Sequence, residues 1–342
     1  MSTVTYWGES LLKLSFSQRL SPLNFCPAGN WWVAVERKMK INNSSRPLVT
    51  VLMTAYNTER FIDLAIKSLL KQTYRQLEII VVDDGSTDKT AAKAVRRAKR
   101  DGRLTLFSLP RNCGPSLASN FGLERSRGQF LARMDADDIA FPDRIEKQVS
   151  FLDHHPEVVI VGGQCLLINE EGEIIGEKRF PTDHRVIYRS LFQMNPIQHP
   201  ACMINRRLLP QGKIFYHNHS VLAHDLELVF ELAQYGQLAN LDEPVLYYRQ
   251  SANSLSLRNP KETFRATFSI RNKALKAYHY HPSGRGWLSH FGQALAVALL
   301  PKGLIYPLFC RMRFRGVKMS QKGVAAGWRN IFNGALLREI PE

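Results

Sequence analysis

The sequence predicts an α/β fold in which a mostly parallel sheet is flanked by helices and followed by a C-terminal helical region. Three observations support this prediction. Short apolar, β-rich runs alternate with helical patterns between residues 48 and 134. Each run is apolar on both faces, which is typical of strands buried in a parallel sheet. Beyond Arg258 the pattern is helical.

The expected elements alternate from residue 48 onward. Strands are expected at Leu48–Thr54, Leu77–Val82, Leu104–Ser108 and Phe130–Met134. Helices are expected from Thr58 to Gln72, from Thr87 to Lys99 and from Pro115 to Arg125. A mixed sheet edge is then expected, with a strand Val158–Val161 and a hairpin of Cys165–Asn169 with Ile174–Phe180. A helix Leu222–Gln234 and an extended run Ala239–Arg249 follow.

Charge divides the chain into three regions. The formal net charge is +16, yet residues 47–256 carry 25 Lys/Arg and 25 Asp/Glu. Residues 1–46 carry 6 Lys/Arg against 2 Asp/Glu, and residues 257–342 carry 15 against 3. We therefore expect an N-terminal extension (1–46), a central folded domain (47–256) and a basic helical region (257–342). A neutral domain argues against nucleic acid as a partner, whereas basic flanks favour contact with an anionic membrane surface.

Cysteine usage and the N-terminus bear on the cellular location. The five cysteines are scattered, odd in number and without ligand spacing: Cys26, Cys113, Cys165, Cys202 and Cys310. This argues against a disulfide framework or a zinc site and suits a reducing compartment. Lys13 and Arg19 interrupt the apolar stretch near the start, so no secretory signal is expected. The sequence predicts a cytoplasmic protein, peripheral on the inner face of the cytoplasmic membrane.

Polar residues stand where three of the predicted strands end. They are Thr54, Tyr56, Asp83, Asp84, Asp135, Asp137 and Asp138. The carboxyl ends of parallel strands meet at one edge of a sheet, where ligands gather. Clustered carboxylates repel one another unless a hard cation such as Mg²⁺ lies between them. Turn or helix-capping roles are the alternative for these acids, as they are for Ser86, Thr87 and Asp88.

Two segments carry a resemblance to a known family. They are VTVLMTAYNTERFIDLAIKSLLKQTYRQLEIIVVDDGSTDKT and NCGPSLASNFGLERSRGQFLARMDADDIAFPDRIEKQVSFL, and they resemble the family 2 glycosyltransferases with the GT-A fold. The resemblance covers about residues 47–256. It implies a GT-A-like, Rossmann-type sheet and a catalytic domain over those residues. It also implies transfer of a sugar, with inversion, from a nucleotide-diphosphate sugar to a hydroxyl of a glycan or lipid-linked acceptor.

The resemblance implies roles for the residues that match the family. Thr54 and Tyr56 would contact the nucleotide base, and Asp84 would bind it, with Asp83 supporting the same site. In the Asp-x-Asp motif, Asp135 would face the ribose or the metal. The second acid of the motif, Asp137, would bind Mn²⁺ or Mg²⁺ bridging the diphosphate.

Asp225 matches the position of the catalytic base in this family. It would deprotonate the acceptor hydroxyl for in-line attack, a task that a carboxylate can perform. An acid favoured by the dipole of a helix N-terminus is the alternative. His224 stands where relatives commonly have Glu, so a role for that position does not carry over.

Several further positions depart from the family pattern or allow a structural role. Ser251 stands where many relatives have a His that helps to hold the diphosphate, which leaves the Ser251 hydroxyl or Arg249 as a weaker substitute. Ser119 stands where Arg is frequent. His199 is a packed histidine or an acceptor contact, and Arg144 is expected to be structural.

The tail combines apolar and basic residues. Residues 288–309 are largely apolar but are interrupted by Pro301, Lys302 and Pro307, so they fall short of the ~20 residues needed to span a bilayer. Basic residues follow from Arg311, and Trp31-Trp32 with Arg37, Lys38 and Lys40 could join the same surface. The pattern favours an interfacial helix on anionic lipid. Helices packed on the core with a solvated basic rim are the alternative.

Three functions therefore remain open on the sequence. The first is a metal-dependent glycosyltransferase of cell-envelope polysaccharide biosynthesis. The second is a sugar nucleotidyltransferase, although no glycine- and basic-rich triphosphate loop stands near Thr54. The third is a non-catalytic scaffold that binds glycan or lipid.

Overall fold

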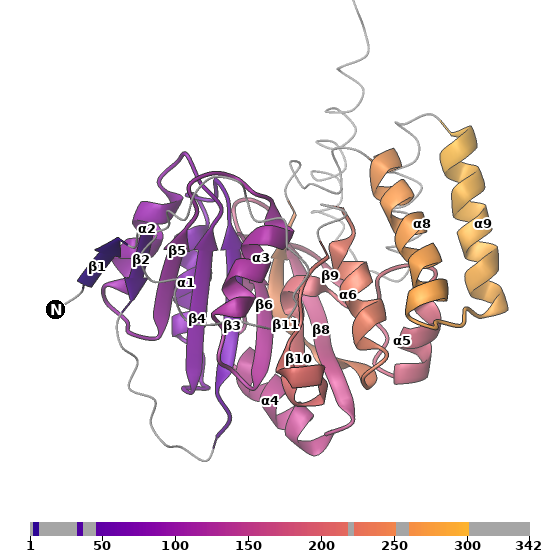
Figure 1. The fold of residues 1–342 in the computed structure, drawn as a ribbon, viewed down its shortest axis with the longest axis horizontal. Coiled ribbons are helices and arrows are strands. Elements are labelled where there is room, and N and C mark those ends of the chain that lie inside the picture. Colours follow the sequence, from indigo (N-terminus) through magenta and orange to yellow (C-terminus); the bar gives the residue numbers. More distant parts are fainter. Residues whose placement is uncertain (1–2, 7–32, 37–45, 218–221, 251–259, 301–342) are drawn as a thin grey trace, which may run out of the picture.

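The computed structural model describes residues 3–6, 33–36, 46–217, 222–250 and 260–300. In these ranges the strands form one mixed sheet in the order β1-β2-β5-β4-β3-β6-β10-β8-β11-β7, with β9 paired to β8 (Figure 1). The strands are β1 Thr3–Tyr6, β2 Val33–Glu36, β3 Val49–Ala55, β4 Leu77–Asp83, β5 Leu104–Ser108, β6 Phe130–Asp135, β7 Ile139–Ala140, β8 Val158–Ile168, β9 Ile174–Lys178, β10 Met203–Asn205 and β11 Gln237–Arg249. The α-helices are α1 Ile62–Leu70, α2 Thr90–Ala98, α3 Pro115–Glu124, α4 Arg144–His154, α5 His184–Ser190, α6 His224–Leu232, α8 Pro260–Ala277 and α9 Gly284–Leu299.

Some of the sequence predictions fall on residues outside the described ranges. These are Ser251, Trp31, Trp32, Arg37, Lys38, Lys40 and the basic residues from Arg311 onward.

The centre of the sheet is parallel, as expected. β3 pairs in parallel with β4 on one side and β6 on the other, and β4 pairs in parallel with β5. The register sets Thr54 opposite Asp135 and Ala55 opposite Asp83. The carboxyl ends of β3, β4 and β6 therefore lie at the same edge of the sheet.

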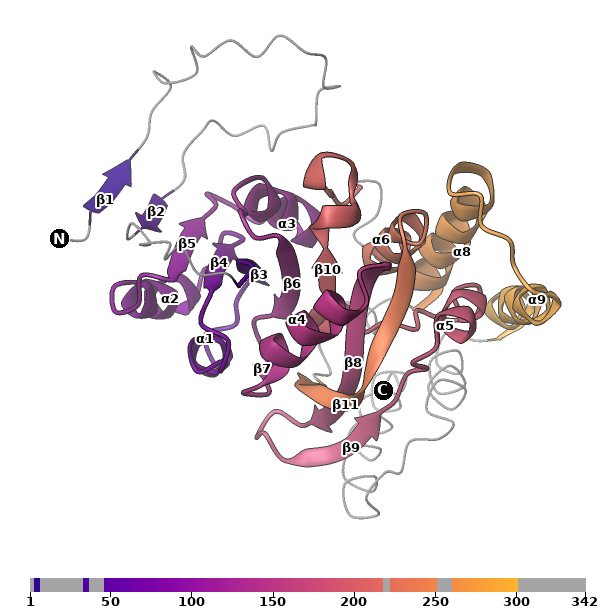
Figure 2. The ribbon, with the colours of Figure 1, turned by 90° about the horizontal axis from the view of Figure 1, so that it is seen from below.

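Alternation along β3 divides the core between the two faces of the sheet. Val49, Val51 and Met53 pack in one cluster with α1, α2 and α4, while Leu52 packs in the other with α3, α5 and α6. Figure 2 shows α1 and α2 on one side of the sheet and α3 on the other. Each fully buried Val, Leu or Ile contributes about 1.5–3 kcal/mol, so this double-sided burial explains why the strands are apolar throughout.

Two helices begin three or four residues later than expected because the loops before them bond to each other. The N–H groups of Thr58 and Glu59 donate to Thr90 Oγ1 (2.8 Å) and Asp88 Oδ2 (3.0 Å). The Lys89 N–H donates in return to Glu59 Oε2 at 2.9 Å. The polar side chains here fasten the ends of β3 and β4 together, which supports a structural role for Asp88.

The second half of the domain differs more from the prediction. β8 is one continuous strand through Gly162 and Gly163, and it lies inside the sheet between β10 and β11 rather than at an edge. A Cβ at Gly163 would lie 2.6 Å from Val245 Cγ2, so glycine allows β11 to pack closely. The hairpin of β8 with β9 is confirmed. β7 and β10 have two and three residues, too short to show a pattern in sequence.

The helical region after the sheet is confirmed over residues 260–300. α8 packs on α6, where Lys273 pairs with Glu227 and the Tyr278 hydroxyl donates to the same carboxylate at 3.2 Å. α9 lies beyond α8 at the end of the molecule opposite β1 (Figures 1 and 2). Among the helices of the described ranges, none combines the length and apolar character needed to cross a bilayer.

Candidate functional site

The structure brings the predicted residues of β3, β4 and β6 to one edge of the sheet. Thr54 is half-buried near the end of β3, and Tyr56 follows it with 45% of its surface exposed. Asn57 then adopts the left-handed region at φ 51° and joins the next loop. Its N–H donates to Ser86 Oγ and its Oδ1 accepts the Thr87 N–H, both at 2.9 Å. The loops after β3 and β4 are thus hydrogen-bonded to each other, and Tyr56 stays exposed at this edge of the sheet.

Asp83 and Asp84 are both buried at the end of β4. The Asp84 carboxylate accepts the N–H groups of Cys113 (2.8 Å) and Gly114 (2.9 Å), so it holds the loop before α3. Burial raises the pKa of Asp84 to about 6, against the opposing effect of these two hydrogen bonds. Burial also raises the pKa of Asp83, whose Oδ1 has no hydrogen-bond partner among the described residues. Burial of these two neighbouring carboxyl groups therefore costs free energy at this edge of the sheet.

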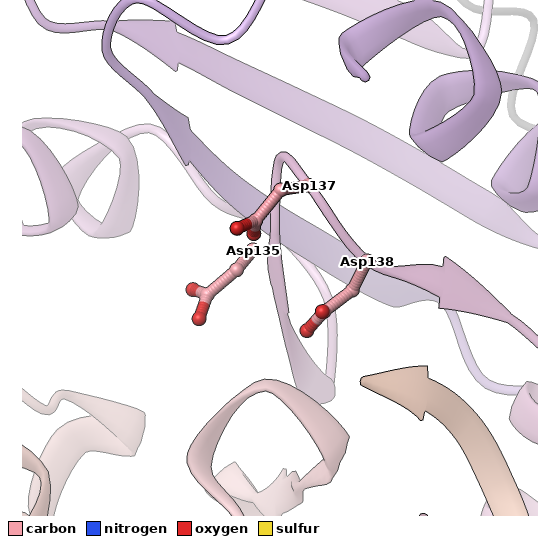
Figure 3. A group of neighbouring side chains, drawn as sticks. All are labelled: Asp135, Asp137 and Asp138. Atoms are coloured by element: carbon pink, nitrogen blue, oxygen red, sulfur yellow. The ribbon is translucent and has the colours of Figure 1, made fainter. Parts of the chain in front are cut away.

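Three carboxylates form a cluster in the turn after β6. One oxygen from each of Asp135, Asp137 and Asp138 lies within 4.8 Å of the others. Figure 3 shows the three side chains projecting to the same side of the turn. Burial raises the pKa of Asp135 to about 6, and the charge of Asp137 acts in the same direction. Burial likewise raises the pKa of Asp137 and, well above its ordinary value, that of Asp138.

The cluster fits a hard divalent cation. All of its donors are carboxylate oxygens, the ligands that Mg²⁺ and Mn²⁺ prefer. Asp138 Oδ2 is buried without a hydrogen-bond partner among the described residues. A cation would relieve both the repulsion between the acids and the cost of their burial. The sequence prediction named Asp135 and Asp137 as ligands, and the structure adds Asp138 to the group.

Arg249, at the end of β11, fastens the acidic turn to the rest of the sheet. Its backbone N–H donates to Asp138 Oδ1 and its Nε donates to the Asp137 carbonyl, both at 2.8 Å. Its Nη1 donates to the carbonyls of Asn169 (2.5 Å) and Glu170 (3.0 Å). Nε and Nη1 of the guanidinium thus donate to backbone carbonyls, which gives Arg249 a positioning role for the turn. Its role as a substitute diphosphate ligand stays a prediction.

Asp225 lies in the first turn of α6, as predicted. Its Oδ2 accepts a hydrogen bond from Asn195 Nδ2 at 2.9 Å. The charge of Asp225 contributes to the raised pKa of Asp135, so the two carboxyl groups lie within electrostatic reach of each other. An amide that orients one oxygen leaves the other available to a ligand. Acids from separate segments thus meet in one region.

Two residues that the sequence did not reveal, Arg133 and Tyr216, join Ser119, His199 and His224 in a polar layer beside these acids. Arg133 is 2% exposed, and its Nη2 donates to Ser119 Oγ at 3.1 Å. The His199 and Tyr216 side chains share a hydrogen bond of 2.6 Å between Nε2 and the hydroxyl, and the His224 ring packs edge-on against both. Burial holds the pKa of His199 well below its ordinary value, which keeps the ring neutral. The period of two along β6, which sets Arg133 on the same face as Asp135, could have revealed this arginine.

Comparison with known proteins agrees with this geometry. Residues 50–209 match the family model described as glycosyl transferase family 2. An uncharacterized glycosyltransferase of Haemophilus influenzae is 34% identical over 218 residues, which cover 61% of this chain and 68% of that protein. The chain belongs to glycosyl transferase family 2. The amylovoran biosynthesis glycosyltransferase AmsE of Erwinia amylovora is 30% identical to this family 2 chain over 216 residues, covering 62% and 79% of the two proteins.

The solved structures support the fold of this family 2 glycosyltransferase. Residues 1–349 of TarS from S. aureus, crystallised in complex with UDP, superpose with a TM-score of 0.55 at 19% identity. The match covers 84% of this chain and 81% of the TarS chain. The fold is therefore that of the GT-A glycosyltransferases, as predicted, with helices after the sheet.

Proposed function

We propose that this family 2 member is an inverting, metal-assisted glycosyltransferase of hexosyltransferase type. It would move a sugar from a nucleotide-diphosphate sugar to a hydroxyl of a glycan or lipid-linked acceptor. The observation that carries this proposal is the cluster of three carboxylates after β6, with Asp225, oriented by Asn195, within electrostatic reach of Asp135. The proposed transfer uses a base for the acceptor hydroxyl and acids that would hold the cation opposite the diphosphate.

The donor would lie along the edge formed by β3, β4 and β6. Thr54 and Tyr56 would contact the base, and Asp84 would accept from it through lone pairs that the two N–H groups leave free. Asp83 would support the same site. The TarS structure holds UDP, which supports a nucleotide donor for a chain of the same fold.

Mn²⁺ or Mg²⁺ would be held by Asp137 and Asp135, with Asp138 adjacent. When bound, the cation supplies Lewis-acid neutralisation of the diphosphate charge. The contribution of the chain itself is to keep these carboxylates together, through the bonds that Arg249 makes to Asp137 and Asp138. Asp135 would also face the ribose.

Asp225 would act as the general base. Its carboxylate would take the proton of the acceptor hydroxyl while that oxygen attacks the anomeric carbon. The bond between the anomeric carbon and the diphosphate oxygen would break, and the nucleoside diphosphate would leave with the electron pair. Attack opposite the leaving group inverts the configuration at the anomeric carbon.

The biological setting follows from the relatives and from charge. AmsE is named for amylovoran biosynthesis, which supports a polysaccharide or lipid-linked acceptor in cell-envelope biosynthesis. We assign residues 47–256 to the catalytic domain and residues 257–342 to a basic region that would hold the enzyme on the cytoplasmic face of the membrane. The N-terminal extension covers residues 1–46.

The test separates donor binding from transfer. A thermal-shift screen of nucleoside diphosphates and nucleotide-sugars, with and without Mn²⁺, identifies the donor because a ligand of the native state raises its stability. Asp225→Asn should keep the donor-induced shift but lower transfer about 10²–10⁴-fold, the usual contribution of a general base. Asp137→Asn should lose the Mn²⁺-dependent part of the shift.

Asp242→Asn is the matched control, because Asp242 is an exposed acid in an ion pair with Arg179. It should behave as the unmodified chain in both measurements. Transfer at the full rate by Asp225→Asn would refute the assignment of the base. Unaltered cellular effects of that variant would favour the non-catalytic scaffold instead.

A further inference from the structure

α9 packs on the protein through its polar side. Gln293 Nε2 donates to the Gln193 carbonyl and Gln293 Oε1 accepts from Arg271 Nη1, both at 2.9 Å. The His290 ring lies 5.1 Å from the rings of Phe192 and Phe268, between α8 and the segment after α5. The inward side of α9 thus includes the polar residues Gln293 and His290, beside the Trp287 ring, which packs edge-on against Phe192 at 5.2 Å.

Four large apolar side chains of α9 face outward. Leu288, Phe291, Leu295 and Leu299 are 76%, 63%, 60% and 72% exposed. Their spacing of three, four and four residues sets them in one row along the helix. Figures 1 and 2 place this helix outermost among the described elements at its end of the molecule. A contiguous apolar row of this kind marks an interaction surface rather than scattered exposed residues.

Charge identifies the partner. From Gly286 to Leu300 the chain contains no Asp, Glu, Lys or Arg, yet Arg285 precedes this stretch and Lys302 follows it. The region from residue 257 carries 15 Lys/Arg against 3 Asp/Glu. An uncharged apolar row bordered by cations suits the boundary between acyl chains and anionic headgroups. A second protein copy would bring the same excess of positive charge and would repel it.

We infer that the outward row of α9 (Leu288, Phe291, Leu295 and Leu299) is the surface by which the enzyme sits on an anionic lipid bilayer. The inward bonds of Gln293 fix one side of α9 to the protein, so the helix lies along the membrane with the leucines in the acyl boundary. This inference deepens the membrane setting of the proposed function by naming the contact face.

Vesicle binding by the full chain tests the inference. The variant replaces all four residues by Ser (Leu288→Ser, Phe291→Ser, Leu295→Ser, Leu299→Ser). Its affinity for phosphatidylcholine–phosphatidylglycerol vesicles, measured by co-sedimentation, should fall at least about tenfold. Burial of a single leucine already changes an affinity by about this factor. The matched control is Leu64→Ser with Ile174→Ser, apolar residues that are 50% and 55% exposed on other elements. The control should bind as the unmodified chain does.

The other outcomes contradict the inference. Unchanged vesicle binding by the four-residue variant would overturn it, as would equal binding to vesicles of phosphatidylcholine alone. A further contrary outcome is that the unmodified chain binds no vesicles and elutes as a dimer in gel filtration. If the four substitutions then abolished that dimer, the row would be assigned to a second copy of the chain. Circular dichroism checks that the variant stays folded, and Leu295→Trp, which adds a residue favoured at membrane interfaces, should strengthen binding.

The test is independent of the transfer chemistry. Asp225→Asn should bind vesicles as the unmodified chain does, and the four-residue variant should keep the donor-induced thermal shift. Failure of the membrane inference would thus leave the proposed reaction standing, and failure of the reaction would leave the membrane surface standing.

Discussion

Both oxygens of the Asp84 carboxylate already accept backbone N–H groups, from Cys113 and Gly114. Even so, burial raises the pKa of this carboxyl to about 6. At neutral pH the folded chain therefore keeps a buried charge that costs stability, as expected of a residue retained for binding rather than for folding.

The stability of the chain should depend on pH through Asp84. A carboxyl whose pKa is raised on folding favours the folded state below its unfolded pKa, and that contribution is lost as pH rises through the folded pKa. The free energy of unfolding should therefore fall between pH 4 and pH 7, with Asp84 accounting for about 3 kcal/mol at most. The side chain of Asp84→Asn stays neutral, so the free energy of unfolding of this variant, measured by urea denaturation at pH 4 and pH 7, should fall less. An identical slope in Asp84→Asn would contradict this role, while Asp242→Asn should keep the original slope.

At the scale of the elements, the turn after β4 shapes the edge of the sheet at which we propose that the donor binds. Gly85 has φ +69°, and a Cβ there would lie 2.3 Å from the carbonyl carbon of Arg111. The turn therefore packs directly on the backbone of the loop that Asp84 holds. Glycine is required at this position both for its backbone angle and for the close approach.

Gly85→Ala should destabilise the chain by more than about 2 kcal/mol, because it adds a backbone clash to the ~1–2 kcal/mol of left-handed strain. It should also weaken the donor-induced thermal shift, since the loop at Arg111 must move. Gly172→Ala is the control: Gly172 has φ +90° with nothing within 4 Å of an added Cβ, so it carries the strain alone. Equal unfolding free energies for the two variants in urea would show that the close approach is unimportant.

At the scale of the whole molecule, Arg144 joins the parallel half of the sheet to the mixed half. This fully buried side chain donates from Nη2 to the carbonyls of Arg133 (2.7 Å) and Cys202 (3.3 Å), and from Nε to Gln148 Oε1 (3.2 Å). Desolvation lowers the pKa of Arg144 to about 10, so the guanidinium stays charged at neutral pH. These contacts give it the structural role expected from the sequence.

Arg144→Met should lower the free energy of unfolding by about 3–5 kcal/mol, because it removes the buried hydrogen bonds of the guanidinium and a countercharge to the acidic cluster. Urea denaturation measures this change. Arg100→Met, at an exposed position, should stay within about 0.5 kcal/mol of the unmodified chain. A similarly small change for Arg144→Met would show that the two halves hold together without it.

The parallel half of the domain and most of the proposed site can be predicted from the sequence alone. Local patterns suffice there: β3, β4, β5 and β6 are apolar runs separated by helices, and Asp84, Asp135 and Asp137 stand at their ends. Strands of a parallel sheet that end at one edge must bring such residues together. The helical character of residues 260–300 could likewise be predicted from local pattern.

The tertiary structure alone decided the contacts between distant segments. The clamp of Arg249 on the acidic turn joins residues more than a hundred positions apart, and Asn195 reaches Asp225 from another element. β10 inserts between β6 and β8 on three residues, too few to carry a pattern. The outward exposure of Leu288, Phe291, Leu295 and Leu299 also depends on which side of α9 packs against the rest of the chain. Such features depend on side chains meeting across long sequence separations, which hydrophobic periodicity does not encode.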